Sequence, residues 1–540
     1  MPHLKRFSVI LWMNTLLIII FSACNNNTSQ NKKNDTVPVV SLKDKTIQGS
    51  FNSKLDVFFD SSRLTQFLEA YPKLEPYKKD LDSFYYKRKF AFAWYDKNGL
   101  IEPAANLFNR IQNISDEGLQ DTFPYIHEFI YLMKNNGMDS LNKPSPFTDF
   151  MLTSQYFIYA RNVWQGIDEK QSISLDWLLP RKKVSYNELL DSLVSGKDIL
   201  DNAPVYIQYG RLRSFLKKYK DIQAKGGWPQ IIPEKKVYKL GDSSATVTAL
   251  RNHLSITEDL LENNNSSIFD SALFKGLVHY QERLGLTMDG AAGPAVFREM
   301  NIPVEKRIEQ IIVNMERSRW VPVNLQSNYI IVNIPEYKLH VYENNKHVWD
   351  MNVVVGQPAH KTVIFNGEIK YVVFSPYWNV PPGIMRNEVM PGIQKNSNYL
   401  ANHNMEWNGG NVRQKPGPNN SLGLVKFLFP NSFDIYLHDT PAKSLFGESS
   451  RAFSHGCIRL SDAEKMADYL LRNDTTWSKK SIYTAMHSGK VKFVTLKNPE
   501  PVFIAYFTAW VTADGILNFR NDVYKRDTRL ASTILKSPQK

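Results

Sequence analysis

One cysteine and two histidines near the C-terminal end of the chain have the residue types of a nucleophilic catalytic site. Cys457 lies in the segment 454–460, which reads Ser-His-Gly-Cys-Ile-Arg-Leu. His455 stands two residues before the cysteine, and His438 precedes Ser454 by fifteen intervening residues. A cysteine reacts as its thiolate, so it needs a proton acceptor, and imidazole is the side chain that titrates closest to neutral pH. Either histidine is therefore a candidate base for Cys457.

The thiol has no disulfide partner inside the expected mature chain. The sequence holds two cysteines, and the other, Cys24, lies in a segment that we expect to carry a lipid. Gly456 lets the backbone approach a substrate closely, and the N–H groups of Gly456 and Cys457 are candidate donors to an oxyanion. Ser461 and Glu464 fit a capping box, which predicts a helix that begins just after the cysteine and whose dipole favours negative charge there.

The N-terminus has the pattern of an export signal. Lys5 and Arg6 precede an apolar run over 7–21, which is short for a membrane-spanning helix and typical of a signal-peptide core. Residues 21–24 read Phe-Ser-Ala-Cys and resemble a bacterial lipobox, which implies cleavage before Cys24 and attachment of a lipid to it. An ordinary cleaved signal with an incidental cysteine is the alternative.

We therefore expect a signal peptide over 1–23 and a flexible polar tether over 24–50, with the bulk of the protein in the periplasm and anchored through lipid. Asn25 follows the cysteine, where some lipoproteins of the inner membrane carry aspartate, and this favours the outer membrane.

Composition narrows the class of protein. A chain of 540 residues is too long for one core and predicts two to four domains. The formal net charge of +13 would attract anionic wall polymers or lipid headgroups, although a diffuse positive surface without a specific partner is an equally good interpretation. The sequence has no Lys/Arg-rich run and no nucleic-acid motif, so we expect no nucleic-acid partner. We also expect no cofactor, no metal site and a monomer.

Three helical regions are expected before the catalytic motif. Residues 51–234 have apolar and aromatic residues at helical spacing and predict a scaffold domain. Residues 235–303 resemble the three-helix peptidoglycan-binding module in the order of their elements, with a polar insertion at 258–267. A helical spacer without binding activity is the alternative for this module. A connecting helix is expected within 304–325.

The period of apolar residues changes to two after this helix. Alternation over 337–342 followed by Asn344-Asn345 predicts a β-hairpin, and further strands are expected up to residue 500. We assign 326–500 to a β-rich catalytic domain that carries the cysteine. The segment 385–422 is rich in Asn, Gly and Pro and is interpreted as a lid inserted in this domain, or else as a solvated loop. Residues 501–540 hold a tail and further strands, over Phe503 to Phe519, that we expect to pack on the catalytic domain. The fold class expected is thus multidomain α+β.

At this point the chain resembles a known family. The segments 438–440, His-Asp-Thr, and 454–459, Ser-His-Gly-Cys-Ile-Arg, resemble the signature of YkuD-type L,D-transpeptidases, and the order of scaffold, wall-binding module and lid resembles the long periplasmic branch of that family. The resemblance implies that Cys457 is the nucleophile, that His438 is the general base, and that His455 and Gly456 shape the oxyanion pocket. It further implies substrate contacts for Arg459, Tyr436, Trp378 and Ser454. In this family the base is often oriented by a backbone carbonyl, so we do not expect the Asp439 carboxylate to complete a triad.

The family implies an acyl transfer in cell-wall synthesis. A tetrapeptide stem of peptidoglycan would acylate the cysteine with release of terminal D-alanine, and a second stem would accept the acyl group to give a 3→3 cross-link. Water as acceptor would make the enzyme an L,D-carboxypeptidase, and a lysine of a lipoprotein would make it a protein-attachment enzyme. Two other readings remain. One is a non-catalytic wall-binding lipoprotein, and the other is a metal-dependent hydrolase with His438, Asp439 and His455 as ligands.

Overall fold

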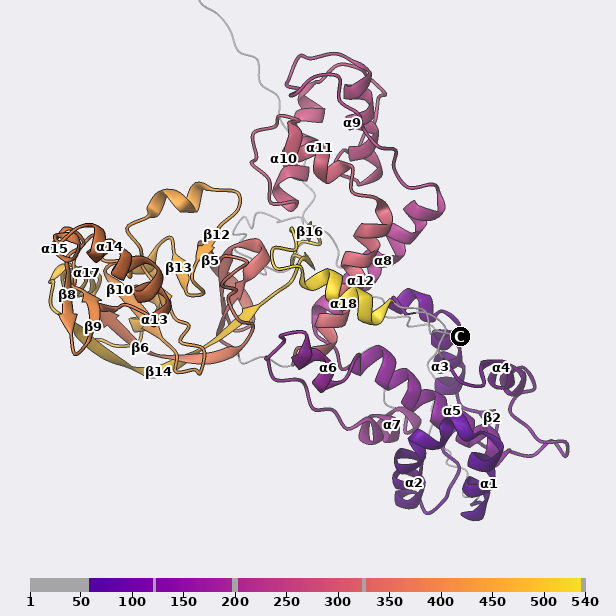
Figure 1. Ribbon diagram of the computed structural model, residues 1–540. Coiled ribbons are helices and arrows are strands. Elements are labelled where there is room, and N and C mark those ends of the chain that lie inside the picture. Colours follow the sequence, from indigo (N-terminus) through magenta and orange to yellow (C-terminus); the bar gives the residue numbers. More distant parts are fainter. Residues whose placement is uncertain (1–57, 120–122, 197–202, 323–326, 536–540) are drawn as a thin grey trace, which may run out of the picture. The chain divides into compact units, whose positions relative to one another are not determined.

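The computed structural model describes residues 58–119, 123–196, 203–322 and 327–535 (Figure 1). The predicted signal peptide, the tether and Cys24 lie outside these residues. Helices dominate the described residues before 322 and strands dominate the catalytic region after 327, so the predicted multidomain α+β class is confirmed. Among the described residues, no helix is both long and apolar enough to cross a bilayer.

The N-terminal helical region is built around α5 (Pro146–Tyr159), in which every side chain from Thr148 onward is buried. Its Asp149 carboxylate accepts hydrogen bonds from the backbone N–H groups of Ala93 and Trp94, which ties the preceding loop to the central helix. The other elements of this region are α1 (Ser62–Ala70), α2 (Lys78–Lys87), β1 (Tyr95–Asp96), β2 (Gly99–Leu100), α3 (Glu102–Gln112), α4 (Ile126–Lys134), α6 (Glu169–Ser174), α7 (Tyr186–Val194) and α8 (Ile207–Ala224).

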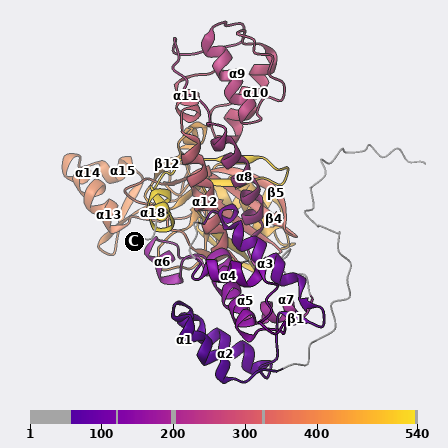
Figure 2. The ribbon, with the colours of Figure 1, turned by 90° about the vertical axis from the view of Figure 1, so that its right-hand side faces the viewer.

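Three short helices follow, α9 (Ala245–Ile256), α10 (Ser271–Arg283) and α11 (Pro294–Met300), and both Figure 1 and Figure 2 show them gathered in one bundle. Ser244 and Asp270 cap the first two helices by accepting hydrogen bonds from backbone N–H groups of the first turn. The apolar faces expected from the sequence are buried, with Val247, Leu250, Leu254, Leu273, Leu277 and Tyr280 in the core. The long helix α12 (Val304–Trp320) follows and packs along α8.

The catalytic region is a closed β-structure. Its strands pair in the order β5-β13-β11-β10-β6-β14-β3-β4, and β4 also pairs with β5, so these eight described strands form a ring to which β12 adds outside. Alternate residues of the strands enter one hydrophobic core. The bounds are β3 (Tyr329–Asn333), β4 (Lys338–Glu343), β5 (Lys346–Gly356), β6 (Asn366–Phe374), β10 (Val425–Leu428), β11 (Leu437–His438), β12 (Ala452–Ser454), β13 (Ile458–Leu460) and β14 (Lys492–Ala505). The helices α16 (Ala463–Leu471) and α17 (Lys479–His487) complete it, and β14 runs through the boundary expected at residue 500.

The predicted hairpin is confirmed at β4 and β5. Asn344 and Asn345 connect the two strands with φ of 50° and 60°, the left-handed values that a two-residue hairpin turn needs and that asparagine tolerates. Leu339 and Val341 point into the core, so His340 between them lies on the opposite face of β4.

The segment expected as a lid is a small folded unit rather than an irregular loop. It holds β7 (Trp378–Asn379), α13 (Pro382–Ile384), α14 (Met390–Lys395), α15 (Tyr399–Asn402), β8 (Met405–Asn408) and β9 (Asn411–Gln414), with a π-helical turn over Met385–Val389. The strands form their own sheet in the order β7-β9-β8 around a core of Val380, Val389 and Val412. Because β7 pairs with β9, the unit begins at Trp378 and not at residue 385.

The strands expected over Phe503 to Phe519 pack on the catalytic domain only in their first part, since Phe503 to Ala505 end β14 and Ile504 is buried in the catalytic core. The hairpin that follows packs elsewhere. The strands β15 (Ala509–Val511) and β16 (Leu517–Phe519) bury Ala509, Val511, Leu517 and Phe519 in the core of the helical regions, not in that of the catalytic domain. The side-chain amide of Gln208 on α8 both donates to and accepts from the backbone of Val511, at 2.8 Å in each case. Alternation identifies a strand with a buried face, but it does not say which core buries it. The chain then ends its described part in α18 (Arg526–Ile534).

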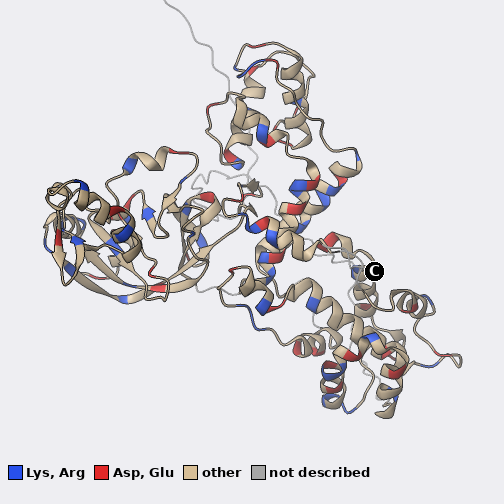
Figure 3. Cartoon of the chain, viewed as in Figure 1, with Lys and Arg blue, Asp and Glu red and all other residues tan. Residues whose placement is uncertain are grey.

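Charge is spread over the whole described chain. Figure 3 shows Lys and Arg on helices and strands of every region, with Asp and Glu interspersed among them. Within the described residues, Lys and Arg are thus not confined to one region of the chain.

Candidate active site

Two parallel strands bring the candidate nucleophile and the candidate base together. In the pairing of β11 with β13, Leu437 is opposite Ile458 and His438 is opposite Arg459. Leu437 and Ile458 are fully buried in the domain core, so their neighbours leave the sheet on the other face. The N–H of Ile458 donates to the carbonyl of Tyr436, which extends this register by one residue to Cys457. Tyr436, His438, Cys457 and Arg459 therefore share one face of the sheet.

The His438 ring is held in a single tautomer. Its Nδ1 atom lies 2.5 Å from the backbone carbonyl oxygen of Asp439. A carbonyl oxygen only accepts hydrogen bonds, so Nδ1 carries the proton and Nε2 keeps a lone pair. Burial lowers the pKa of His438 to about 4, although the hydrogen bond to Asp439 acts in the opposite direction. The imidazole is therefore neutral at pH 7 and can accept a proton at Nε2.

The Asp439 carboxylate is engaged elsewhere. One oxygen accepts from the N–H of Leu424 at 2.9 Å, and the other accepts from the Lys443 ammonium at 2.6 Å. Gly423 permits this approach, because a Cβ at that position would lie 2.3 Å from the carboxylate. The base is thus oriented by a backbone carbonyl, as the family resemblance implied, and not by a third carboxylate side chain.

The Cys457 thiol is half-buried, and its sulfur lies 3.6 Å from the backbone carbonyl oxygen of Asp434. Burial raises the pKa of this thiol above its ordinary value, while hydrogen bonding to Tyr436 acts in the opposite direction. The neutral thiol therefore predominates at neutral pH. Before or during attack on a carbonyl, the thiol proton must therefore move to a neutral base. His438 is neutral at this pH and can accept it.

Two cations lie on the same face, and sequence reasoning found only one of them. Lys426 on β10 is the register partner of His438, and its ammonium lies 5.5 Å from the ring centre of Tyr436. Desolvation lowers the pKa of Lys426, and a negative charge on Cys457 raises it. The signal for Lys426 is the cross-strand register, which alternation along one strand does not reveal. The Nε of Arg459 is buried and has no hydrogen-bond partner within the described part of the chain.

The loop that carries the cysteine is held by hydrogen bonds between its own residues. The Ser454 hydroxyl donates to the carbonyl of Cys457 at 2.5 Å and accepts from the N–H of Gly456 at 3.1 Å. Ser454 is buried, so in this structure it holds the loop instead of reaching a substrate as predicted. The same bond occupies the Gly456 N–H, one of the two oxyanion donors expected from the sequence. Gly456 has a φ of 117°, a conformation that favours glycine.

Of the two other predicted residues, His455 faces the inserted unit and Trp378 belongs to it. His455 Nε2 lies 3.4 Å from a Glu388 carboxylate oxygen, and the His455 ring centre is 5.1 Å from that of His360. Trp378 lies on β7 and packs against the core of the insertion. The insertion therefore contacts the loop next to the cysteine, at His455.

The helix after the cysteine begins later than predicted and is capped by another residue. Asp462, not Ser461, is the N-cap of α16, and its carboxylate accepts from the N–H of Lys465 at 2.9 Å. Strand β13 separates Cys457 from this helix. At about 3.3 Å per residue, the strand places the sulfur well beyond the single turn over which a helix dipole acts. The dipole therefore does not stabilise the thiolate, and nearby cations and hydrogen bonds take that role.

Known proteins share this region. Residues 327–485 match the YkuD model, an L,D-transpeptidase catalytic domain, and residues 79–216 match a scaffold domain. The catalytic region belongs to the YkuD family of L,D-transpeptidase domains. A Haemophilus influenzae protein named as a candidate L,D-transpeptidase is 31% identical over 255 residues, which cover 43% of this chain and 51% of that protein. The chain thus spans about half the length of this curated relative.

Solved L,D-transpeptidases are more distant. One from Mycobacterium smegmatis is 13% identical with a TM-score of 0.20, and the match covers 33% of this chain and 58% of that one. One from Stackebrandtia nassauensis is 14% identical with a TM-score of 0.22, and the match covers 50% of this chain and 94% of that one.

Proposed function

We propose that this protein is a cysteine-dependent L,D-transpeptidase that forms 3→3 cross-links between peptidoglycan stem peptides. The observation that carries the proposal is the shared sheet face of Cys457 and His438, set by the register of β11 and β13 inside a YkuD domain. The half-buried thiol, the neutral imidazole and the two cations on this face have the chemistry that acyl transfer needs.

The acylation step uses the neutral pair. Cys457 Sγ attacks the carbonyl carbon of the diamino acid at position three of a tetrapeptide stem while His438 Nε2 takes the thiol proton. The C–N bond to the terminal D-alanine breaks, the leaving amine receives that proton, and a thioester remains. In the second step the side-chain amine of another stem attacks the thioester, His438 takes the amine proton, and the thiolate leaves and is protonated.

The cations act on the negative charges of this reaction. Arg459 and Lys426 stabilise the developing thiolate, and the Arg459 guanidinium is suited to bind a carboxylate of the stem. The Cys457 N–H and the flanking loop are the candidate oxyanion site, and His455 and Tyr436 border it. Trp378 joins them when the inserted unit covers the loop.

Product analysis tests the proposal. Purified protein is incubated with tetrapeptide-rich wall fragments, and the muropeptides are identified by mass spectrometry. We expect 3→3 dimers from the wild type and none from Cys457→Ala or His438→Gln, while His487→Ala, a change of an exposed histidine on α17, leaves them unchanged. Cross-links formed by Cys457→Ala protein would refute the nucleophile. Free tripeptides alone would identify a carboxypeptidase, and stem peptides attached to an added lipoprotein would identify an attachment enzyme.

We also propose that the chain acts as a monomer in the periplasm, held by a lipid on Cys24, and that the three-helix bundle binds peptidoglycan. The support is the lipobox pattern at 21–24 and the resemblance of 235–303 to the wall-binding module. Cell fractionation tests the anchor, since Cys24→Ser protein is expected in the soluble periplasmic fraction. Sedimentation of the protein with purified sacculi tests wall binding, and light scattering tests the monomer.

A further inference from the structure

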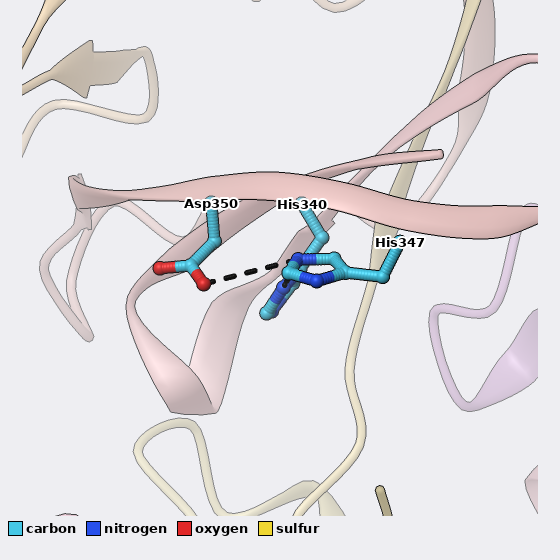
Figure 4. A group of neighbouring side chains, drawn as sticks. All are labelled: His340, His347 and Asp350. Atoms are coloured by element: carbon cyan, nitrogen blue, oxygen red, sulfur yellow. Dashed lines mark hydrogen bonds and ion pairs between the residues drawn. The ribbon is translucent and has the colours of Figure 1, made fainter. Parts of the chain in front are cut away.

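A group of potential metal ligands lies on the β4–β5 hairpin, apart from the cysteine site. His340 on β4 is the register partner of Asp350 on β5, and His347 lies on β5 close to the turn. Figure 4 shows the three side chains on one side of the hairpin, pointing toward one another. Their ligand atoms all lie within 4.8 Å of one another. Within the described residues, these side chains converge in the way that metal ligands do, whereas His438, Asp439 and His455 are turned to other partners.

The separations are close to those around a bound ion. Nδ1 of His340 is 3.4 Å from Nε2 of His347, which is 3.8 Å from Oδ2 of Asp350. Zinc binds nitrogen and oxygen at about 2.0–2.2 Å, so two ligands of a tetrahedral ion lie about 3.3–3.5 Å apart. The two histidines already have this spacing. His347 and Asp350 keep 41% and 34% of their side chains exposed, so small rotations can bring the third ligand in.

A buried carboxylate orients the first ligand. Glu336 Oε2 lies 3.0 Å from Nε2 of His340, and a carboxylate accepts, so Nε2 carries the proton and Nδ1 faces the other two ligands. Glu336 is buried, and the side-chain amide of Asn333 also donates to its Oε2 atom. An ionised carboxylate behind a histidine is the outer-shell arrangement that metal sites use.

Neighbouring charged side chains reduce the affinity of the site for a metal ion, but they leave ligand atoms free to bind one. The Lys338 ammonium donates to Oδ1 of Asp350 at 2.9 Å, which leaves Oδ2 for an ion. The Arg520 guanidinium lies near enough to Glu336 for the two opposite charges to interact. The site therefore has the carboxylates of Glu336 and Asp350 against the cations of Lys338 and Arg520, with the two imidazoles as further ligands. The three candidate ligands also line a cavity, which gives an ion a route to them.

We propose that His340, His347 and Asp350 bind a divalent transition metal ion, of which Zn²⁺ fits best, with Glu336 behind His340 and a fourth position open to water. The ion would take the place of the proton between the two imidazoles, and that proton would move to Nδ1 of His347, so that Nε2 of His347 can bind the ion and both rings stay neutral. Asp350 precedes Gly356, at the cysteine end of β5, by six residues, or about 20 Å of strand. An ion on the hairpin would therefore cross-link β4 and β5 and stabilise their pairing, and it would take no part in acyl transfer.

Calorimetric titration with zinc chloride tests the site in the full mature chain. The Cys457→Ala protein is used throughout, so that the catalytic thiol does not bind zinc. We expect one equivalent of zinc to bind, a loss of that binding in His347→Ala and Asp350→Asn, and about 10- to 100-fold weaker binding in Glu336→Gln. His487→Ala is the matched control and should bind as the parent does. Equal affinity in the parent, His347→Ala and Asp350→Asn would overturn the proposal and leave a hydrogen-bonded cluster only.

Thermal unfolding gives a second readout that does not depend on activity. Zinc at saturation should raise the unfolding temperature of the parent by a few degrees, since an ion that binds only the folded state stabilises it. The same concentration of zinc should not change the unfolding temperature of the His347→Ala variant. Cross-linking by the wild type should survive chelation, so failure of the metal site and failure of the transpeptidase proposal are separate results.

Discussion

His438 and Arg459 are register partners in the parallel pairing of β11 with β13, so the imidazole and the guanidinium leave the sheet on the same face. Cys457 precedes Arg459 by two residues and shares that face. The base therefore has a cation as its cross-strand neighbour, and burial together with this charge keeps the imidazole neutral. A neutral imidazole beside a thiol of raised pKa exchanges a proton during attack and does not form an ion pair beforehand.

The first prediction concerns acid pH. His438 works as a base only when it is deprotonated, so acylation of Cys457 should be lost as the pH falls through about 4, the pKa to which burial lowers His438. An unperturbed histidine would place this loss near pH 6.5. The rate of Cys457 acylation by a carbapenem, an inhibitor class of this family, is measured by mass spectrometry between pH 3.5 and 8. A midpoint near 6.5 would contradict the burial argument.

The same depressed pKa makes His438 a source of acid lability. The unfolded chain binds a proton at this histidine below about pH 6.5, while the folded chain does so only below about 4. The stability contributed by the buried neutral ring is complete above pH 6.5 and is lost as the pH falls toward 4. His438→Gln protein should therefore lose less stability than the wild type over this interval, as measured by urea unfolding.

The two cations should set the reactivity of the thiol. Removing a positive charge disfavours the thiolate, so Lys426→Met and Arg459→Met should each raise the pKa of Cys457 further. The smaller fraction of thiolate should slow alkylation by iodoacetamide about three- to tenfold at pH 7.5. Lys480→Met, on α17, serves as the matched control. An unchanged alkylation rate in both variants would show that neither cation acts on the sulfur.

The sequence indicated several residues of the candidate site, but it did not indicate which strands would bring them together. Cys457 and His438 follow from residue type, from the scarcity of cysteine and from the family signature. The strands also follow from alternation, and the Asn344-Asn345 turn follows from turn chemistry. Lys426 was missed because its place beside Tyr436 depends on which strands become neighbours, and local alternation carries no information about pairing.

The sequence also did not predict which core each buried strand packs against. The alternation over Phe503 to Phe519 does not distinguish the catalytic core from the helical core. Ile504 is buried in the catalytic core as predicted, whereas Val511, which is hydrogen-bonded to Gln208, is buried in the helical core. The inserted unit was predicted as a lid from its Asn, Gly and Pro content, yet its few apolar residues suffice for a small core. Composition alone does not show that short strands far apart in sequence will pair.

The corrected start of α16 gives a further prediction. Asp462→Ala removes the side chain that accepts from the Lys465 N–H, and loss of an N-cap costs about 1 kcal/mol of unfolding free energy. Ser461→Ala should be close to neutral, because Ser461 is not the cap. Chemical denaturation of the two variants compares them directly. A larger loss in Ser461→Ala would restore the capping box expected from the sequence.

The last prediction concerns the support behind the cysteine loop. Gly356 ends β5 beside Gly456, and a Cβ at Gly356 would lie 2.1 Å from the carbonyl oxygen of His360 and 3.1 Å from Cα of Gly456. The neighbouring Thr362 hydroxyl links the two glycines, since it accepts from the Gly356 N–H and donates to the Gly456 carbonyl. Gly356→Ala must therefore displace the turn at 360–362, and we expect Thr362 to transmit this shift to the cysteine loop.

We expect Gly356→Ala to destabilise the fold by about 1–3 kcal/mol, as overpacking does. It should also slow acylation of Cys457 more than tenfold, because His438 stays on β11 while the sulfur moves with the loop. Gly447→Ala is the matched control, since a Cβ there meets no atom of the described residues within 4 Å. Denaturation and carbapenem acylation are measured on both proteins. A Gly356→Ala variant that is destabilised but acylates at the wild-type rate would show that the loop is positioned by Ser454 alone, and one with neither change would show that the close approach of the two glycines is not required.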